Sequence, residues 1–187
     1  MRKWDNRVGS VHRIISGAAR WAADVLIVLM LAWFFVLYMG YRVEVDGRSM
    51  EPLMKNQDIV LTDKVCYNFR DVKRFEVIAF RKPDHAEKIS VKRVVALPGE
   101  TVQIRNGDIY INGQKLDTEG RIRTAAVAGR AEETITLGED EYFVMGDWPE
   151  VSEDSRFDSV GNVHREQIIG RVWFRLEPFS SFGPIGE

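Results

Sequence analysis

Residues Trp21–Tyr41 read WAADVLIVLMLAWFFVLYMGY, and this stretch divides the chain into two unlike parts. From Val25 onward it holds no charged residue for seventeen positions. As a helix rising about 1.5 Å per residue, that run and the turn before it reach the roughly 30 Å of a bilayer core. Asp24 lies near the end of the span, where headgroups tolerate a carboxylate. We expect one membrane-spanning helix over residues 21–41.

A secretory signal that is removed after export is the alternative interpretation, because such signals also place basic residues before an apolar run. The run here exceeds the roughly 7 to 15 residues of a signal core, and its exit, Tyr38–Val43, lacks a small-x-small cleavage pattern. We therefore favour an uncleaved anchor.

Charge is distributed unevenly around the span. The first twenty residues carry five basic side chains and one acidic one, a net charge of +4, which leaves -6 for the rest of a chain whose total is -2. Basic segments beside a span remain in the cytoplasm. We expect a cytoplasmic basic N-terminus (1–20), the span (21–41) and one extracytoplasmic domain (42–187).

Composition limits the function of that domain. A chain of 187 residues with 45% hydrophobic content has room for one buried core besides the anchor. Its net charge of -2 argues against a nucleic-acid binder. The single cysteine, Cys66, excludes an internal disulfide and a multi-cysteine metal cluster, and it is expected to be a small buried thiol. We expect no metal and no cofactor.

After the span, short segments rich in β-branched and aromatic residues alternate with turn signals, which predicts a mainly β, antiparallel fold. Asn106-Gly107 and Asn112-Gly113 each separate two such segments and suit a type I′ turn, which predicts a meander. Residues 117–133 are poorly patterned, so 106–140 is expected to be a hairpin with a loop insertion. The expected strands are 41–45, 58–62, 75–80, 89–97, 101–105, 108–111, 134–137, 142–145 and 170–176.

Ser49 is a candidate nucleophile in the segment Val45–Pro52, VDGRSMEP. Gly47 permits a tight backbone and Pro52 fixes a bend, so Ser49 is expected on a shaped loop. Many serines in such loops only cap turns. This one is distinguished by its position, because eight residues from Tyr41 hold its hydroxyl within about 28 Å of the span. A substrate would meet Ser49 close to the membrane.

Lys92 is the favoured base, because it interrupts the strand-like run Ile89–Leu97 and shares a face with Val94 and Ala96. Apolar surroundings disfavour the ammonium ion, so the pKa falls and the neutral amine can accept a proton from Ser49. The alternative is a lysine that reaches from the strand edge to water. Histidine is the more usual base, but none of the three has a context of burial beside a nucleophile, although His164 stays open. The others are His12 and His85.

The acidic segment Gly146–Asp158 is the third candidate region. Trp148 and Pro149 interrupt the alternating ligands that a calcium loop needs, so it does not predict a metal site. A buried cation needs a carboxylate partner, so we expect two supporting contacts from this segment. Asp154 is expected to pair with Arg93 or Arg156, and Ser152 to hydrogen-bond the amine of Lys92.

Three segments of the chain, Gly47–Pro52, Lys92–Glu100 and Gly146–Arg156, resemble the sequence boxes of bacterial type I signal peptidases, in the family's order and behind an anchor. The resemblance covers roughly residues 20–176. It implies a serine endopeptidase of the bacterial plasma membrane that cleaves signal peptides from exported preproteins after small-x-small sites. The implied partners are secretory preproteins, the export machinery and the lipid bilayer.

The resemblance also assigns roles to residues. Ser49 matches the nucleophile and Lys92 the general base, where the endoplasmic-reticulum-type relatives carry histidine. Some members have a hydroxyl residue at the position of Gly47 to bind the oxyanion, so here the backbone N–H of Ser49 is expected to do so. The supporting residues are Ser152, Asp154, Arg93 and Arg156.

Several points stay open. Trp148 and Pro149 stand where the family often has asparagine and arginine, which leaves the loop conformation and substrate preference open. Ala126-Val127-Ala128 is itself small-x-small, so self-cleavage after Ala128 is a further hypothesis. The rival functions are a peptidase that cuts no other protein and a non-enzymatic anchored β domain that binds a partner.

Overall fold

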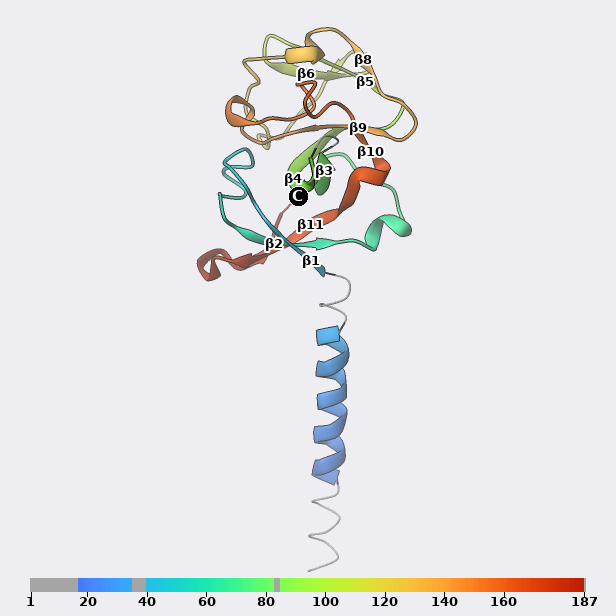
Figure 1. Ribbon diagram of the computed structural model, residues 1–187, viewed down its shortest axis with the longest axis vertical. Coiled ribbons are helices and arrows are strands. Elements are labelled where there is room, and N and C mark those ends of the chain that lie inside the picture. Colours follow the sequence, from blue (N-terminus) through green and yellow to red (C-terminus); the bar gives the residue numbers. More distant parts are fainter. Residues whose placement is uncertain (1–16, 35–39, 83–84, 187) are drawn as a thin grey trace, which may run out of the picture. The chain divides into compact units, whose positions relative to one another are not determined.

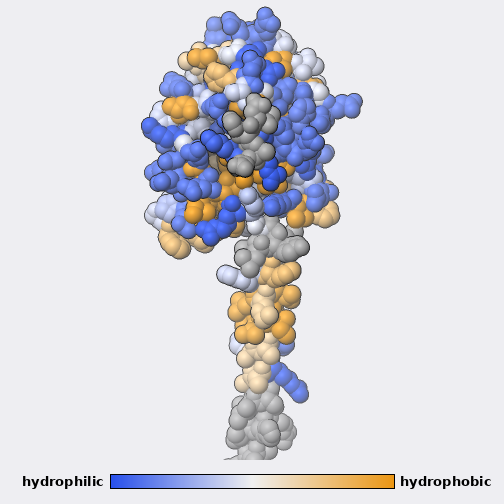
Figure 2. Space-filling view, viewed as in Figure 1, coloured by the Kyte–Doolittle hydropathy of each residue, from blue (hydrophilic) through white to orange (hydrophobic). Residues whose placement is uncertain are grey.

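The computed structural model describes residues 17–34, 40–82 and 85–186, with the side chains of 85–87 excepted, and it divides into two units, Met1–Gly40 and Tyr41–Glu187. The first unit contains a helix, Gly17–Phe34, that is long and apolar enough to cross a membrane. Its 18 residues extend about 27 Å. Figure 2 shows the largely hydrophobic surface of this helix.

The helix begins four residues before the predicted span. The end of that span at residues 35–39 lies outside the described residues. Its last two residues, Gly40 and Tyr41, are not helical as predicted, because they open strand β1 (Gly40–Glu44).

The second unit is built on two antiparallel sheets, which confirms the predicted mainly β fold (Figure 1). The larger sheet has the order β1-β2-β11-β3-β4-β9-β10, with β12 paired to β11. Chain neighbours such as β2 and β3 are separated by β11, so distant segments meet. The remaining bounds are β2 Ile59–Asp63, β3 Val77–Lys82, β4 His85–Ala96, β9 Glu141–Met145, β10 Val163–His164, β11 Ile168–Glu177 and β12 Gly183–Pro184.

The smaller sheet has the order β7-β6-β5-β8 and contains the predicted meander. Asn106 and Gly107 have φ of 50° and 83°, and Asn112 and Gly113 have φ of 51° and 76°. Both dipeptides thus adopt the positive φ that the type I′ prediction required. The strands are β5 Thr101–Arg105, β6 Asp108–Ile111, β7 Gln114–Lys115 and β8 Ile135–Thr136.

The predicted strands agree best with the structure where buried and exposed residues alternate clearly. Strands β5 and β6, for example, have the predicted bounds. Strands β7, β10 and β12 were not predicted, since two residues each are too few to show a period. Short 3₁₀ helices occupy several connections: η1 Cys66–Asn68, η2 Gly129–Glu132, η3 Pro149–Val151, η4 Arg165–Gln167 and η5 Phe179–Ser181.

The poorly patterned segment 117–133 is irregular, as expected, but it is also part of the core. Ile122, Ala125 and Ala131 from this segment are buried against the smaller sheet. A second core cluster joins the larger sheet to the segment after β1, through Val45, Met50 and Met54, among others. This second cluster fixes the loop that carries Ser49.

Candidate active site

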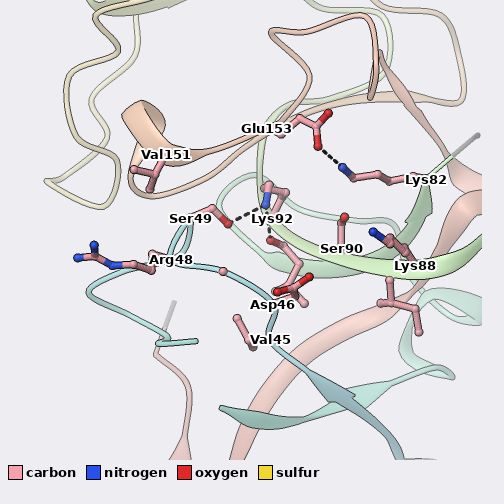
Figure 3. Close-up of a pocket in the computed structure, with 13 residues that line it drawn as sticks. Val45, Asp46, Arg48, Ser49, Lys82, Lys88, Ser90, Lys92, Val151 and Glu153 are labelled. Atoms are coloured by element: carbon pink, nitrogen blue, oxygen red, sulfur yellow. Dashed lines mark hydrogen bonds and ion pairs between the residues drawn. The ribbon is translucent and has the colours of Figure 1, made fainter. Parts of the chain in front are cut away.

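A cleft of about 390 Å³ lies between the segment after β1, strand β4 and the loop that follows β9 (Figure 3). Both sequence candidates for catalysis, Ser49 and Lys92, line it. Its wall residues are Val45, Asp46, Gly47, Arg48, Lys82, Lys88, Ile89, Ser90, Val91, Val151 and Glu153.

Ser49 lies in a tight turn whose backbone is held on both sides. Gly47 has φ of 86°, a conformation that side chains disfavour, and its N–H donates to Asn56 Oδ1 at 2.8 Å. Met50 is completely buried, which anchors the turn from below. The carbonyl of Ser49 accepts a hydrogen bond of 2.9 Å from the backbone N–H of Trp148. The hydroxyl is thereby held at the floor of the cleft.

Lys92 meets Ser49 in this cleft. Its Nζ lies 2.7 Å from Ser49 Oγ and also donates to the carbonyl of Val91 at 3.3 Å. Only 6% of the lysine is exposed. Burial lowers the pKa of Lys92 from 10.5 to about 8, although the carboxylate of Asp154 opposes that shift. Strand β4 therefore buries its lysine, as the sequence predicted, and does not direct it to water.

Arg93 points to the opposite face of β4 and pairs with Asp147, the residue that follows Gly146 at the end of β9. Its Nε and Nη2 donate to the two carboxylate oxygens at 2.7 Å each, and its Nη1 donates to the carbonyl of Phe75. Burial raises the pKa of Asp147, and the arginine counteracts this. Of the two partners expected for Asp154, Arg93 is therefore not the one used, because it points away from the face of β4 that carries Lys92. The Gly-Asp dipeptide directly after a buried strand was the signal for Asp147.

Asp154 pairs with the other predicted partner, Arg156. Arg156 donates from Nε at 2.8 Å and from Nη2 at 3.0 Å to the two carboxylate oxygens. Asp154 also accepts from the N–H of Gly146 at 3.1 Å, and Arg156 donates to the carbonyl of Pro149 at 2.6 Å. Both charges are almost completely buried. The pair closes the loop after β9 upon itself and so fixes the wall of the cleft.

Ser152 is placed close to the candidate dyad by the short helix η3, which Pro149 begins. Its hydroxyl is buried and has no hydrogen-bond partner among the described residues. The expected hydrogen bond with Lys92 is therefore not formed here, and the orienting role of Ser152 stays a prediction. A Cβ on Gly146 would lie 2.4 Å from Ser152 Oγ, which explains why glycine precedes Asp147.

The predicted oxyanion donor is the backbone N–H of Ser49. Among the hydrogen bonds of the described residues, this N–H donates none, and Gly47 offers no hydroxyl. The prediction that the amide binds the oxyanion is thus compatible with the geometry and stays untested.

Histidine does not reach the cleft in the part of the chain that the structure describes. His164 belongs to β10 and its side chain is 45% exposed. Its Nδ1 lies 3.3 Å from Asp140 Oδ2. His12 and the side chain of His85 lie outside the described residues. Within residues 17–34, 40–82 and 85–186, no group of three or more His, Cys, Asp or Glu residues could hold a metal ion. Lys92 is the titratable side chain that contacts Ser49.

An ion pair that sequence reasoning did not foresee borders the cleft near Lys92. Lys82, at the end of β3, pairs with Glu153 of the loop after β9 (Figure 3). Glu153 also accepts from Ser159 Oγ at 2.7 Å, and these contacts lower the pKa of its carboxyl group. The pair forms one side of the cleft.

Comparisons with known proteins agree with the sequence resemblance. The family described as signal peptidase, peptidase S26, matches residues 18–177. Signal peptidase I of Bacillus amyloliquefaciens is 30% identical over 172 residues, 88% of this chain and 91% of that protein. Signal peptidase IB of Staphylococcus aureus (strain COL) is 27% identical over 179 residues, with 87% and 91% covered.

Two further similarities cover less of this chain. A probable signal peptidase I-2 of Synechocystis is 32% identical over 144 residues, 74% of this chain and 64% of that protein, so the chain matches less than two thirds of its length. The crystal structure of a signal peptidase I from Enterococcus faecalis V583 is 29% identical, covers 55% of this chain and 97% of that one, and has a TM-score of 0.44.

Proposed function

Since this chain belongs to the signal peptidase, peptidase S26, family, we propose that it cleaves signal peptides from exported preproteins after small-x-small sites with a Ser49–Lys92 dyad. The predicted enzyme class, a serine peptidase, is confirmed by that membership. The observation that carries the proposal is the 2.7 Å contact between Ser49 Oγ and Lys92 Nζ. A lysine with a pKa near 8 in that contact is a competent base.

The first half of the proposed reaction forms an acyl-enzyme. Neutral Lys92 accepts the hydroxyl proton as Ser49 Oγ attacks the scissile carbonyl carbon. The oxyanion that develops is bound by the backbone N–H of Ser49, and one such donor contributes about 3 to 4 kcal/mol. The lysine ammonium then gives its proton to the leaving amine of the mature protein. Lys92 is neutral again when the acyl-enzyme is complete.

The second half hydrolyses the acyl-enzyme. A water molecule attacks the ester carbonyl while Lys92 accepts one of its protons, and the same proton returns to Ser49 Oγ as the ester bond breaks. In this proposal, Ser152 and the Asp154–Arg156 and Arg93–Asp147 pairs hold the site in shape. These four charged groups are buried, so their positions are fixed by paired contacts on both sides of the dyad.

Substrate binding is proposed to use the unpaired edge of β4. Residues Arg93–Ala96 pair with β9, whereas Ile89–Lys92 pair with β3 alone. The free edge of that half lines the cleft beside Ser49. An extended peptide can add to such an edge through its backbone, with its side chains in alternate pockets. The β-branched walls Val45, Ile89 and Val91 favour small side chains there.

The proposed setting is the bacterial plasma membrane, with residues 1–20 in the cytoplasm and the catalytic unit outside. The candidate span is the helix Gly17–Phe34, and the basic residues before it support this orientation. Five residues separate this helix from β1, so the catalytic unit begins within about 20 Å of the helix end. A signal peptide still in the bilayer would meet the cleft near the surface, where the export machinery delivers it.

Cleavage of a preprotein in trans tests the proposal. Detergent-solubilised wild type is expected to convert the preprotein to its mature form, and Ser49→Ala is expected to be folded and inactive. Lys92→Arg is expected to lose about 10²- to 10⁴-fold in rate, because guanidinium stays protonated. Substantial activity in Lys92→Arg would exclude lysine as the base. Equal cleavage with and without the protein would favour a non-enzymatic partner-binding domain.

A further inference from the structure

Trp148 contacts two guanidinium groups that come from distant segments. Arg48 Cζ lies 4.6 Å and Arg123 Cζ 4.3 Å from the centre of its ring. Arg48 directly precedes the nucleophile and is held by the Glu51 carboxylate at 2.9 and 3.2 Å. Arg123 comes from the irregular segment 117–133 and, among the described residues, forms no ion pair. Its side chain is instead attracted to the face of the ring, and its charge, after that of Arg48, also helps to lower the pKa of Glu51. We call this group the Arg48–Trp148–Arg123 stack.

The backbone ties this stack to both members of the proposed dyad. The N–H of Trp148 donates to the carbonyl of Ser49 at 2.9 Å, and the N–H of Arg123 donates to the carbonyl of Asp147 at 3.0 Å. Asp147 in turn holds Arg93, the neighbour of Lys92 on β4. Because this hydrogen bond is made by the backbone of Trp148, a shift of that residue would reach Ser49 directly.

Close packing leaves the nucleophile loop little freedom at this contact. A Cβ on Gly146 would lie 2.6 Å from the carbonyl oxygen of Ser49, so the end of β9 and the Ser49 turn are in direct contact. The carbonyl of Ser49 is thus contacted both by Gly146, after β9, and by the backbone N–H of the residue that carries the indole. Such support is what a nucleophile needs, because its position relative to the base is what the reaction depends on.

We propose that Trp148, held by Arg48 and Arg123, is a positioning residue that fixes Ser49 for attack. The inference rests on the proposed function of Ser49 as nucleophile. It gives a role to Trp148 and, through it, to Arg123, which belongs to no sequence box. The stack acts through the Ser49 backbone and not on the substrate, so it is expected to affect kcat more than KM.

Two substitutions of Trp148 separate positioning from general stability in the trans-cleavage assay. Trp148→Ala is expected to lower kcat about 10- to 100-fold with KM within about twofold, because misplacing a reacting group by about 1 Å has effects of that size. Trp148→Phe keeps an aromatic face for both arginines and is expected to remain within about threefold of wild type. A wild-type kcat in Trp148→Ala, or a higher KM with an unchanged kcat, would overturn the proposal.

Arg123→Gln removes one cation from an exposed position and so keeps the test valid if Trp148→Ala unfolds. We expect kcat to fall about 3- to 10-fold with an unchanged Tm. The matched control is Arg105→Gln, because Arg105 is also exposed and lies 4.5 Å from the ring of Tyr110, in the smaller sheet. Its kcat is expected to equal that of wild type. Equal kcat for Arg123→Gln and Arg105→Gln would contradict a positioning role.

Amide hydrogen exchange gives a readout that does not depend on cleavage. Peptides covering residues 46–52 are expected to exchange faster in full-length Trp148→Ala and Arg123→Gln than in Arg105→Gln and wild type. Unchanged exchange in these peptides would contradict the positioning role of the stack, even if activity fell. If wild type failed to cleave preproteins while the exchange difference appeared, the proposed function would fail and the support of the Ser49 loop would stand.

Discussion

At Lys92, the burial that destabilises the folded protein is the same burial that makes the amine a base. Its ammonium form loses hydration in the cleft, and the pKa falls to about 8. The neutral form is then accessible near physiological pH, and it lies 2.7 Å from the Ser49 hydroxyl. The chemistry and the free-energy cost therefore have one cause, and each can be measured separately.

The pH dependence of cleavage follows from this pKa. In the proposed mechanism the active form of Lys92 is the neutral amine, so kcat/KM is expected to rise about tenfold per pH unit below about 8 and to level off above it. Initial rates at low preprotein concentration between pH 6 and 10 measure this profile. A rate that falls through the same range would show that the protonated lysine is the active form.

Lys92→Met is expected to abolish activity and to increase the stability of the folded protein. The unfolded lysine titrates near 10.5 and the folded one near 8, so burial of the charge costs about 3 kcal/mol at pH 7. This cost is full below about pH 8 and is lost as pH rises to 10.5. Methionine of similar length carries no charge, so the variant is expected to be inactive and more stable by up to about 3 kcal/mol at pH 7. Urea unfolding at pH 7 and pH 10.5 tests this, because the gain should shrink at the higher pH.

At the scale of elements, the loop after β9 is the piece that assembles the site. It supplies Asp147 to Arg93 on β4, the N–H of Trp148 to the Ser49 turn, and the Asp154–Arg156 pair that closes it. Pro149 begins the 3₁₀ turn of this loop, so the Trp-Pro departure from the family's usual residues is accommodated by a defined conformation. This one loop therefore connects strand β9, strand β4 and the turn that carries Ser49.

Asp147→Asn is expected to destabilise the protein by about 3 kcal/mol or more, because it leaves the charge of Arg93 buried without a partner. Burial raises the pKa of Asp147 despite the contacts with Arg93, so the expected cost is assigned to the arginine left unpaired and not to loss of the carboxylate itself. Asp108→Asn is the matched control, since its pair with Lys115 is exposed and such pairs contribute little to stability. Equal unfolding free energies for the two variants would contradict this account.

The segment Ala126–Gly129 is not presented as a substrate in the folded chain. Ala128 has helical φ and ψ, Gly129 has φ of 57°, and the carbonyl of Val127 accepts from Arg156 at 2.8 Å. A peptidase needs an extended peptide in its cleft. Stored wild type and Ser49→Ala are therefore each expected to give a single intact mass, and the two masses differ only by the oxygen atom that the substitution removes. Two fragments found in wild type alone, one ending at Ala128 and the other beginning at Gly129, would support the self-cleavage hypothesis.

At the scale of the whole molecule, the chain joins an apolar helix to a catalytic β unit through five residues. In the proposed membrane setting, this short connection keeps the cleft within reach of the bilayer. Such tethering raises the local concentration of substrates that enter through the same membrane. Under the proposed function, membrane-bound preproteins are then expected to be cleaved in preference to soluble ones.

Protease protection in cells tests the proposed orientation. In intact spheroplasts, added protease is expected to degrade the unit after residue 41 and to leave an N-terminal tag protected, because residues 1–20 carry a net +4. The protein should also stay with membranes after alkaline extraction. Protection of the catalytic unit would reverse the orientation, and release by alkali would argue against a span.

The sequence by itself predicted the apolar helix, most of the strands and the two residues, Ser49 and Lys92, that the structure brings into contact. These features follow from local patterns: an uncharged run of bilayer length, alternation within strands, Asn-Gly turns, and a lysine inside an apolar strand. The three short strands carried too few residues to show a period.

Tertiary structure alone decided the partners. Lys92 and Arg93 are adjacent in sequence but point to opposite faces, so only the path of the loop after β9 determines that Arg93 meets Asp147 and that Asp154 meets Arg156. The stack on Trp148 likewise needs the segment 117–133 to return to the nucleophile loop. Pairing between distant segments depends on long-range packing, and no local period in the sequence encodes it.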